Sequence, residues 1–303
     1  MSLSEVGVPG RRVDVLNGGD VAPDGRLLSV AEIQQAFREL RARKPSEPAT
    51  CTGRPSGPAR GSQPAVTRGA DLDGAWVSVV AAHAGAGAST VALAIADAAA
   101  AAGRATHLVE TAHPTRSGLV AAANAELGLD ASGAWRRGSR GQVTIDRRGG
   151  NDTPIGWPAV TASDDGLVVV DLGLPSPDSL TRLATSGCRI VVACRPTVPG
   201  VRLAEQLLNS VTGPVIVASV GAGKWPGEVS ASLGPRLRAL RAANAVVTVP
   251  ADRRLGVTGP TNYPLPKPVA TAGRSLLALI DAARSGDATA SAQSAPRRKG
   301  TTR

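Results

Sequence analysis

Short apolar runs alternate with longer segments rich in Ala and Leu between Trp76 and residue 284. The runs predict strands at 76–82, 105–110, 166–172, 188–194, 214–220 and 245–249, and the segments between them predict helices near 89–102, 116–127, 177–186, 200–211, 228–243 and 271–284. Strands that alternate with helices are joined by crossovers, so the strands lie parallel and helices cover both faces of the sheet. We therefore expect an α/β fold with a mostly parallel β-sheet.

The interval from Ser132 to Asp165 interrupts this alternation. Within it, residues 135–148 have the pattern of a basic loop followed by a short strand. We expect an insertion or an edge hairpin here.

One amphipathic segment precedes the α/β region. Ser29 and Glu32 match the Ser-x-x-Glu pattern of a capping box at the start of a helix over 29–43. Three apolar side chains share one face of this helix: Ile33, Phe37 and Leu40. Because this apolar stripe is narrow and isolated, the helix either docks on the main domain or binds a partner.

Composition completes the division of the chain into segments. Stretches rich in Pro, Gly, Ser and Thr bury too little apolar surface to order themselves. We expect a flexible N-terminus (1–28), a short amphipathic helix (29–43), a linker (44–70), a folded α/β domain (71–284) and a basic disordered tail (285–303).

The net charge of +10 does not by itself indicate a nucleic-acid-binding domain. Residues 1–70 carry ten basic and seven acidic side chains, and residues 284–303 carry five and one, which leaves +3 on the remaining residues. A basic tail can contact nucleic acid or an anionic membrane, but it also serves solubility alone.

Cysteine spacing and hydropathy favour a cytoplasmic protein without a transmembrane segment. The three cysteines form no close pair of the kind that a zinc site or disulfide framework uses. No apolar run reaches the roughly 18 residues of a membrane span, and no signal peptide is recognisable. The three histidines lack a matching set of nearby ligands, so we expect no independent metal site.

A small-residue loop joins the first predicted strand to the first predicted helix. The residues from His83 to Thr90 read His-Ala-Gly-Ala-Gly-Ala-Ser-Thr. Glycines at such a turn let successive backbone N–H groups surround a phosphate at a helix N-terminus. The candidate phosphate-binding residues are Gly85, Ala86, Gly87, Ala88, Ser89 and Thr90.

This loop resembles the variant P-loop of the ParA/MinD group, which reads K-G-G-x-G-K-[ST]-T. Gly85, Gly87, Ser89 and Thr90 match that form, whereas both lysines are replaced. His83 stands where the group has its signature lysine, and Ala88 stands where it has the lysine that contacts the β- and γ-phosphates. The resemblance thus implies a P-loop NTPase fold in which the charges used for hydrolysis are missing.

Three further segments resemble the same group. Residues 105–118 resemble its second strand, with Glu110 and Ala112 at its two acidic positions, and residues 247–254 resemble its late V-P-x-D segment. Asp171 ends a run that resembles the Walker B strand. The resemblance implies ATP or ADP with Mg²⁺ as cofactor, the Mg²⁺ held by Ser89 and Asp171, and Arg116 is a further candidate for phosphate contact.

A purely structural interpretation explains the same residues. Gly85 and Gly87 could form only a tight turn, Ser89 a helix cap and Asp171 a solvated strand end. The P-loop would then be a relic that binds no cofactor.

Three functions follow from these alternatives. The first, which we favour, is a nucleotide-binding or scaffold protein without efficient ATP hydrolysis, serving partition, mobile-element maintenance, division or secretion through an unidentified protein partner. The second is an active but atypical ATPase that forms a homodimer and binds DNA nonspecifically through Arg253, Arg254, Lys267 and Arg274. The third is an interaction protein that binds no nucleotide.

Overall fold

The structure, a computed structural model, describes residues 76–150, 166–176, 179–180 and 188–294. The chain divides into two units, Met1–Gln63 and Pro64–Arg303, and every described residue belongs to the second. The predicted N-terminus, helix 29–43 and linker therefore lie outside the described residues, as do 295–303 of the predicted tail.

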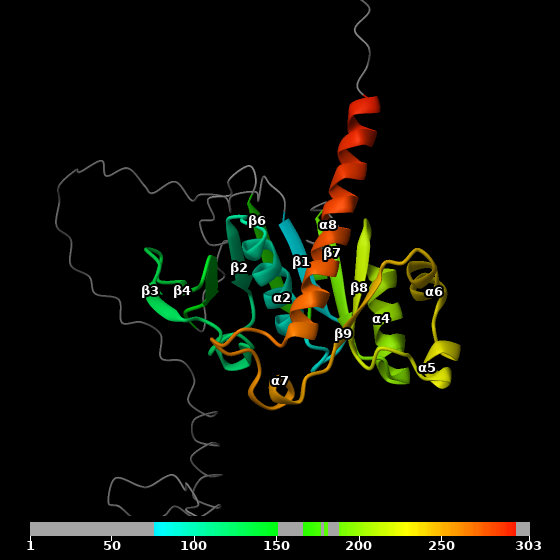
Figure 1. Cartoon of the computed structure of the whole chain (residues 1–303), viewed down its shortest axis with the longest axis horizontal. Coiled ribbons are helices and arrows are strands. Elements are labelled where there is room, and N and C mark those ends of the chain that lie inside the picture. Colours follow the sequence, from blue (N-terminus) through cyan, green and yellow to red (C-terminus); the bar gives the residue numbers. More distant parts are fainter. Residues whose placement is uncertain (1–75, 151–165, 177–178, 181–187, 295–303) are drawn as a thin grey trace, which may run out of the picture. The chain divides into compact units, whose positions relative to one another are not determined.

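One sheet organises the described residues, with its strands in the order β3-β4-β5-β2-β6-β1-β7-β8-β9 (Figure 1). The strands are β1 (Trp76–Ala81), β2 (Thr106–Glu110), β3 (Ala125–Leu129), β4 (Trp135–Arg140), β5 (Val143–Arg148), β6 (Leu167–Gly173), β7 (Arg189–Cys194), β8 (Val215–Gly221) and β9 (Val246–Pro250). Every pairing from β5 across to β9 is parallel, whereas β4 pairs antiparallel with both β3 and β5. All the strands predicted from the apolar runs are present.

Helices cover both faces of this sheet. They are α2 (Ala88–Ala101), α4 (Val198–Ser210), α5 (Gly227–Ala231), α6 (Pro235–Ala242), α7 (Arg253–Thr258) and α8 (Lys267–Ser294), with a 3-10 turn η1 (Pro114–Arg116). Apolar side chains of α2 and α8 share one buried cluster with the sheet, and those of α4, α5 and α6 form a second cluster with β7 and β8. The predicted α/β class, a mostly parallel sheet with helices on both faces, is confirmed.

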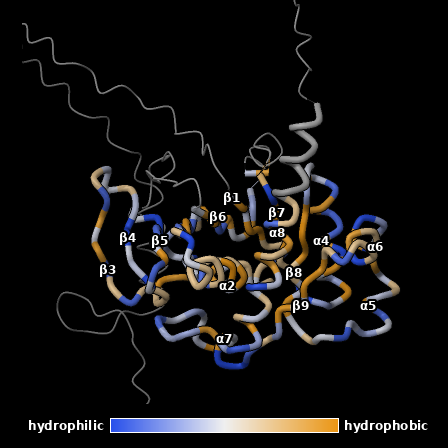
Figure 2. Tube along the Cα trace, turned by 45° about the horizontal axis from the view of Figure 1, so that its top comes forward, coloured by the Kyte–Doolittle hydropathy of each residue, from blue (hydrophilic) through white to orange (hydrophobic). Residues whose placement is uncertain are grey.

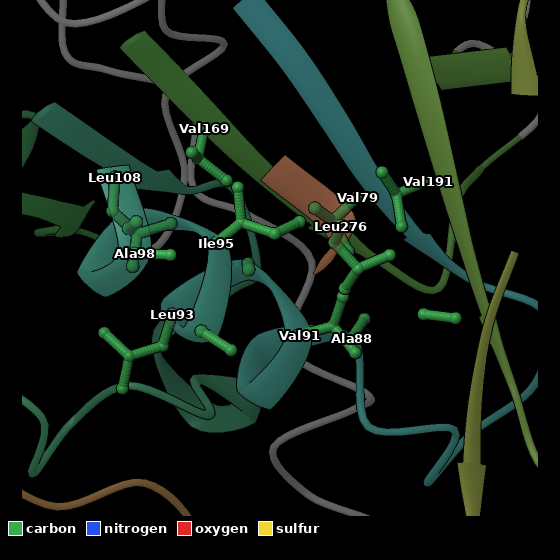
Figure 3. Packing of buried hydrophobic residues seen from close by; sticks show 14 of the residues in the cluster. Val79, Ala88, Val91, Leu93, Ile95, Ala98, Leu108, Val169, Val191 and Leu276 are labelled. Atoms are coloured by element: carbon green, nitrogen blue, oxygen red, sulfur yellow. The ribbon is translucent and has the colours of Figure 1, made fainter. Parts of the chain in front are cut away.

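The core is built from aliphatic side chains. Val79, Val169 and Val191 from three strands meet Ile95 of α2 and Leu276 of α8 (Figure 3). Along the trace, α2 is mostly hydrophobic, whereas α7 includes strongly hydrophilic residues (Figure 2). Helix α2 is therefore a central element of the core, and its N-terminus is fixed by packing.

The helix predicted over 116–127 is wrong. The chain forms η1 there and then strand β3, which pairs with β4. Glu110 holds Ser117 and Gly118 by hydrogen bonds, and the amide of Asn124 donates to the carbonyl of Ser139. These tertiary contacts outweigh the helix propensity of the Ala-rich segment.

The interval that begins at Ser132 does contain the expected hairpin, which is formed by β4 and β5. The first half of this hairpin is strand β4 and not the predicted loop. Arg140, buried on β4, forms an ion pair with Asp97 of α2 and donates to the carbonyls of Ala122, Thr261 and Tyr263. A buried arginine needs such partners, and together they attach the hairpin to the main core.

Three other helix boundaries differ from the predictions. The helix expected over 228–243 is split into α5 and α6, because Gly234 and Pro235 start a new helix. Helix α8 begins earlier than 271 and continues to Ser294, so residues 285–294 of the predicted disordered tail are helical. Of the helix expected over 177–186, only residues 179–180 are described, and both are helical.

Candidate functional site

The candidate loop lies at the centre of the sheet, because β1 runs between β6 and β7. Gly85 and Gly87 adopt φ angles of 73° and 93°, a region that favours glycine. A Cβ at Gly87 would lie 3.2 Å from Cγ1 of Val220, so the space for a side chain is tight there as well. The predicted glycine loop is thus formed between β1 and α2.

Helix α2 begins without a side-chain cap. Gly87 is its N-cap residue and offers no side chain, whereas Thr197 caps α4 and Asp252 caps α7. The first N–H groups of any helix lack acceptors within that helix, and the helix dipole favours negative charge beside them. The N-terminus of α2 therefore provides donors of the kind that a phosphate needs.

Asp171 lies beside this helix end and is only 1% exposed. Its Oδ1 accepts a hydrogen bond of 2.9 Å from the amide of Gly173, and the hydroxyl of Ser89 lies close enough to the carboxylate to lower its pKa. Among the described residues, Oδ2 of Asp171 has no hydrogen-bond partner. Burial raises the pKa of Asp171, whereas the bonds from Ser89 and Gly173 lower it.

The pairing of Ser89 and Asp171 fits a hard cation. A hydroxyl and a carboxylate are the oxygen donors that Mg²⁺ uses together with phosphate, and a bound cation or its water would satisfy Oδ2 of Asp171. When bound, Mg²⁺ would neutralise phosphate charge at this helix end. The structure thus brings together the two residues that the resemblance implied as Mg²⁺ ligands.

Glu110 is a second buried carboxyl group at the same place. It stands opposite Asp171 in the register of β2 and β6, and its Oε1 accepts a 2.6 Å bond from the amide of Gly118. Its Oε2 accepts a bond from the hydroxyl of Ser117. Burial, reinforced by Asp171, raises the pKa of Glu110 to about 7, although the bonds from Ser117 and Gly118 act in the opposite direction.

Gly118 closes the loop after β2 onto the helix end. A Cβ at Gly118 would lie 2.5 Å from Oγ of Ser89, so only glycine permits this approach. The sequence placed Glu110 at an acidic position of the motif but did not indicate that it holds this loop against Ser89.

His83 and Ala88, which stand where the resembled motif has lysines, have different surroundings. Ala88 is 5% exposed and packs in the core. His83 accepts a 3.2 Å bond at Nε2 from the amide of Arg195, and its Nδ1 lies 2.9 Å from the carbonyl of Ala84. Both contacts fit a neutral imidazole with its proton on Nδ1, so His83 supplies no positive charge in this arrangement.

Arg195, which the motifs do not include, contacts the glycine loop. Its Nε donates a 3.0 Å bond to the carbonyl of Gly85. The signal in the sequence was its position directly after the run 188–194, whose strand β7 adjoins β1. Arg116, the cation suggested for phosphate contact, lies exposed in η1.

The four residues suggested for nucleic-acid binding are exposed, but they lie on different helices. Arg253 and Arg254 start α7, while Lys267 and Arg274 lie on α8. Arg254 stacks 4.9 Å from the ring centroid of Tyr263, and Arg274 donates to the hydroxyl of Thr271. Their role in DNA binding stays a prediction.

Other kinds of site are not formed by the described residues. They contain no group of three or more His, Cys, Asp or Glu side chains placed to hold a metal ion. No helix within the described ranges is long and apolar enough to cross a membrane. Cys188 and Cys194 are buried, and burial raises the pKa of Cys194 to about 12, which suppresses thiolate reactivity.

Comparison with known proteins finds similarity only among solved structures. No family model matches, and no curated protein matches. A plasmid partition protein from Borrelia burgdorferi B31 bound to AMPPNP is similar at a TM-score of 0.47 and 10% identity, covering 70% of this chain and 99% of that one. MinD from Pyrococcus horikoshii OT3, complexed with Mg-ADP, is similar at a TM-score of 0.45 and 15% identity, covering 69% and 96%.

A ParA family ATPase from Chlorobium tepidum TLS is also similar, with a TM-score of 0.42 and 15% identity, covering 67% of this chain and 98% of that one. These are structures of the group whose motifs the sequence resembles. At such identities the likeness concerns the fold, and its TM-scores stay below 0.5. The fold class accordingly rests on the strand order and crossovers described above.

Proposed function

We propose that this chain is a degenerate P-loop protein of the ParA/MinD type that binds ATP or ADP with Mg²⁺ and does not hydrolyse ATP efficiently. It would act as a nucleotide-responsive scaffold or adaptor in partition, mobile-element maintenance, division or secretion. Its output would be a contact with a protein partner.

One observation carries this proposal: the uncapped start of α2 adjoins a buried carboxylate oxygen that has no partner among the described residues. Unpartnered buried oxygens are rare because losing hydration without a replacement bond costs about 1–3 kcal/mol. A phosphate at the helix end and a cation at Ser89 and Asp171 would satisfy both features together.

Hydrolysis is disfavoured by the residues that replace the lysines. Transfer of a phosphoryl group depends on fixed positive charges around the phosphate in the transition state. Ala88 carries no charge and His83 is bonded as a neutral ring. Ala112 stands at the second acidic position, so the group's carboxylate for orienting water is absent as well.

The first test is a thermal-shift titration of the full chain with ATP and with ADP, each with Mg²⁺. A ligand that binds only the folded state at about 100 times its Kd stabilises by roughly 2.7 kcal/mol. For a domain of this size that corresponds to a rise in Tm of roughly 5–10 °C. We expect such a rise in the wild type and its loss in Gly87→Val and Ser89→Ala.

Two matched variants separate loss of binding from loss of folding. Gly103→Val introduces the same side chain at another positive-φ glycine, at the opposite end of α2, where no atom lies within 4 Å. Ser275→Ala removes an exposed hydroxyl from α8. Both should keep the nucleotide-dependent rise.

The other two candidate functions predict different results. Absence of any rise at millimolar nucleotide would overturn the proposal and leave a nucleotide-free interaction protein. Steady ATP turnover together with ATP-dependent, salt-sensitive DNA binding would instead support the atypical ATPase and its DNA contacts.

A further inference from the structure

Arg195 emerges next to the glycine loop because of the sheet order. Strand β7 pairs in parallel with β1, and Ala81 is the register partner of Ala193. The residues that follow the two strands therefore leave the sheet side by side. Arg195 is the second residue after Ala193, just as His83 is the second after Ala81.

Two hydrogen bonds fix Arg195 against the loop. Its amide donates to Nε2 of His83 at 3.2 Å, and its Nε donates to the carbonyl of Gly85 at 3.0 Å. A Cβ at Gly200 would overlap the carbonyl oxygen of Arg195 and lie 3.2 Å from Nε2 of His83. The start of α4 is thus packed tightly against this contact, which keeps the Arg195 backbone in place.

The terminal amino groups of Arg195 are unused. In the part of the chain that the structure describes, neither Nη atom makes a hydrogen bond, and the side chain is exposed. A guanidinium presents five N–H donors in a planar fork, so four remain once Nε is engaged. Such a fork suits the oxygens of a phosphate group.

The charges around the loop also favour a cation supplied from outside the loop. The loop and first helical turn, His83 to Thr90, contain no Lys or Arg, and the carboxyl groups of Glu110 and Asp171 lie beneath them. Apart from the charge of a bound Mg²⁺, a polyphosphate placed here would have only backbone amides to offset the carboxylate charge. Arg195 is the one arginine or lysine among the described residues that hydrogen-bonds to the loop.

We propose that Arg195 provides the positive charge that the loop itself has lost, by binding the terminal phosphate of a nucleotide polyphosphate through its two Nη groups. This inference rests on the proposed nucleotide binding and adds a specific residue to it. Because the cation comes from the residue that follows β7 and not from the loop, it would hold the phosphate from one side. That geometry provides binding without the two flanking charges that efficient hydrolysis requires.

The test measures binding of Mg-ATP and of inorganic tripolyphosphate to the full chain by isothermal titration calorimetry. The variants are Arg195→Ala and Arg195→Lys, with Arg136→Ala as the control. Arg136 is an exposed arginine on β4, which three strands separate from β1. We expect Arg195→Ala to weaken both ligands about tenfold or more. Arg195→Lys, which keeps the charge but loses the fork, should lie between, and Arg136→Ala should match the wild type.

The outcomes separate this inference from the proposed function. If the wild type binds ATP and Arg195→Ala binds it equally well, Arg195 has no such role while nucleotide binding stands. If the wild type binds tripolyphosphate but not ATP, and Arg195→Ala loses it, the arginine site stands and the proposed function falls. Binding of neither ligand overturns both.

Discussion

At the scale of single residues, the raised pKa of Glu110 makes the free energy of unfolding depend on pH. Burial raises the pKa of Glu110 from an ordinary 4.5 to about 7, so between these values the folded chain binds more protons than the unfolded chain. The free energy of unfolding should therefore fall as pH rises from 4.5 to 7, by up to about 3 kcal/mol from this group. Glu110→Gln should remove that fall and be more stable than the wild type at pH 7.5.

Urea denaturation at a series of pH values would measure this effect. Glu228→Gln, a change to an exposed carboxyl group on α5, should keep the wild-type slope. Burial alone would raise the pKa of Asp146, but hydrogen bonds from Arg137 and His107 lower it below its ordinary value of 3.8. Asp146 therefore titrates below the range from pH 4.5 to 7 in which the effect of Glu110 is measured. A Glu110→Gln variant with the wild-type slope would show that Glu110 is ionised throughout.

Residue types at motif positions were predictable, whereas their partners were not. Ser89 was identified because it lies in a strand-loop-helix motif of fixed spacing, and Asp171 because it ends an apolar run that resembles the Walker B strand. Arg195 carries no motif, and its contact with Gly85 depends on which strands are neighbours. A single sequence gives the order of the strands along the chain but not which strands are neighbours in the sheet.

At the scale of elements, α2 is held in place by close contact with α8. A Cβ at Gly273 would overlap the backbone carbonyl of Ala94, so the two helices touch through a glycine. Gly273→Ala should push them apart and cost about 1–3 kcal/mol, as overpacking does. Chemical denaturation at pH 7 would measure it.

Gly256→Ala is the matched control for this change. Gly256 lies in α7, and a Cβ added there would have no atom within 4 Å, so alanine should be neutral or stabilising through helix propensity. Equal stability of the two variants would mean that α2 and α8 adjust without cost.

The regular elements were predictable where burial is continuous and failed where tertiary contacts decide. The runs that form the central parallel strands are apolar almost throughout, as a sheet covered on both faces requires. Residues 116–127 have helix-like composition, but pairing with β4 and the hold of Glu110 on Gly118 impose other structure. Long-range contacts of this kind do not appear in the hydrophobic periodicity of a short stretch of sequence.

At the scale of the whole molecule, the proposed function requires that nucleotide binding and ATP hydrolysis depend on different residues. The loop amides and Ser89 lie at the start of α2 and Asp171 is buried in β6, whereas the lysines of the motif would add charge. Returning a lysine at the position of Ala88 should therefore strengthen ATP binding about tenfold or more through a new charge-assisted contact. ATP hydrolysis should stay at background, because Ala112 and His83 still lack the remaining groups of the motif.

Calorimetry and a phosphate-release assay on Ala88→Lys would separate these two effects. Ala101→Lys places the same side chain at the exposed far end of α2 and should change neither. The Tm of each variant without nucleotide checks that the lysine is accommodated, since Ala88 packs in the core. Rapid hydrolysis by Ala88→Lys would mean that one lysine is the only group this chain lacks for ATP hydrolysis, which would contradict the proposed function. Tighter binding without hydrolysis would support a protein that acts through nucleotide binding alone.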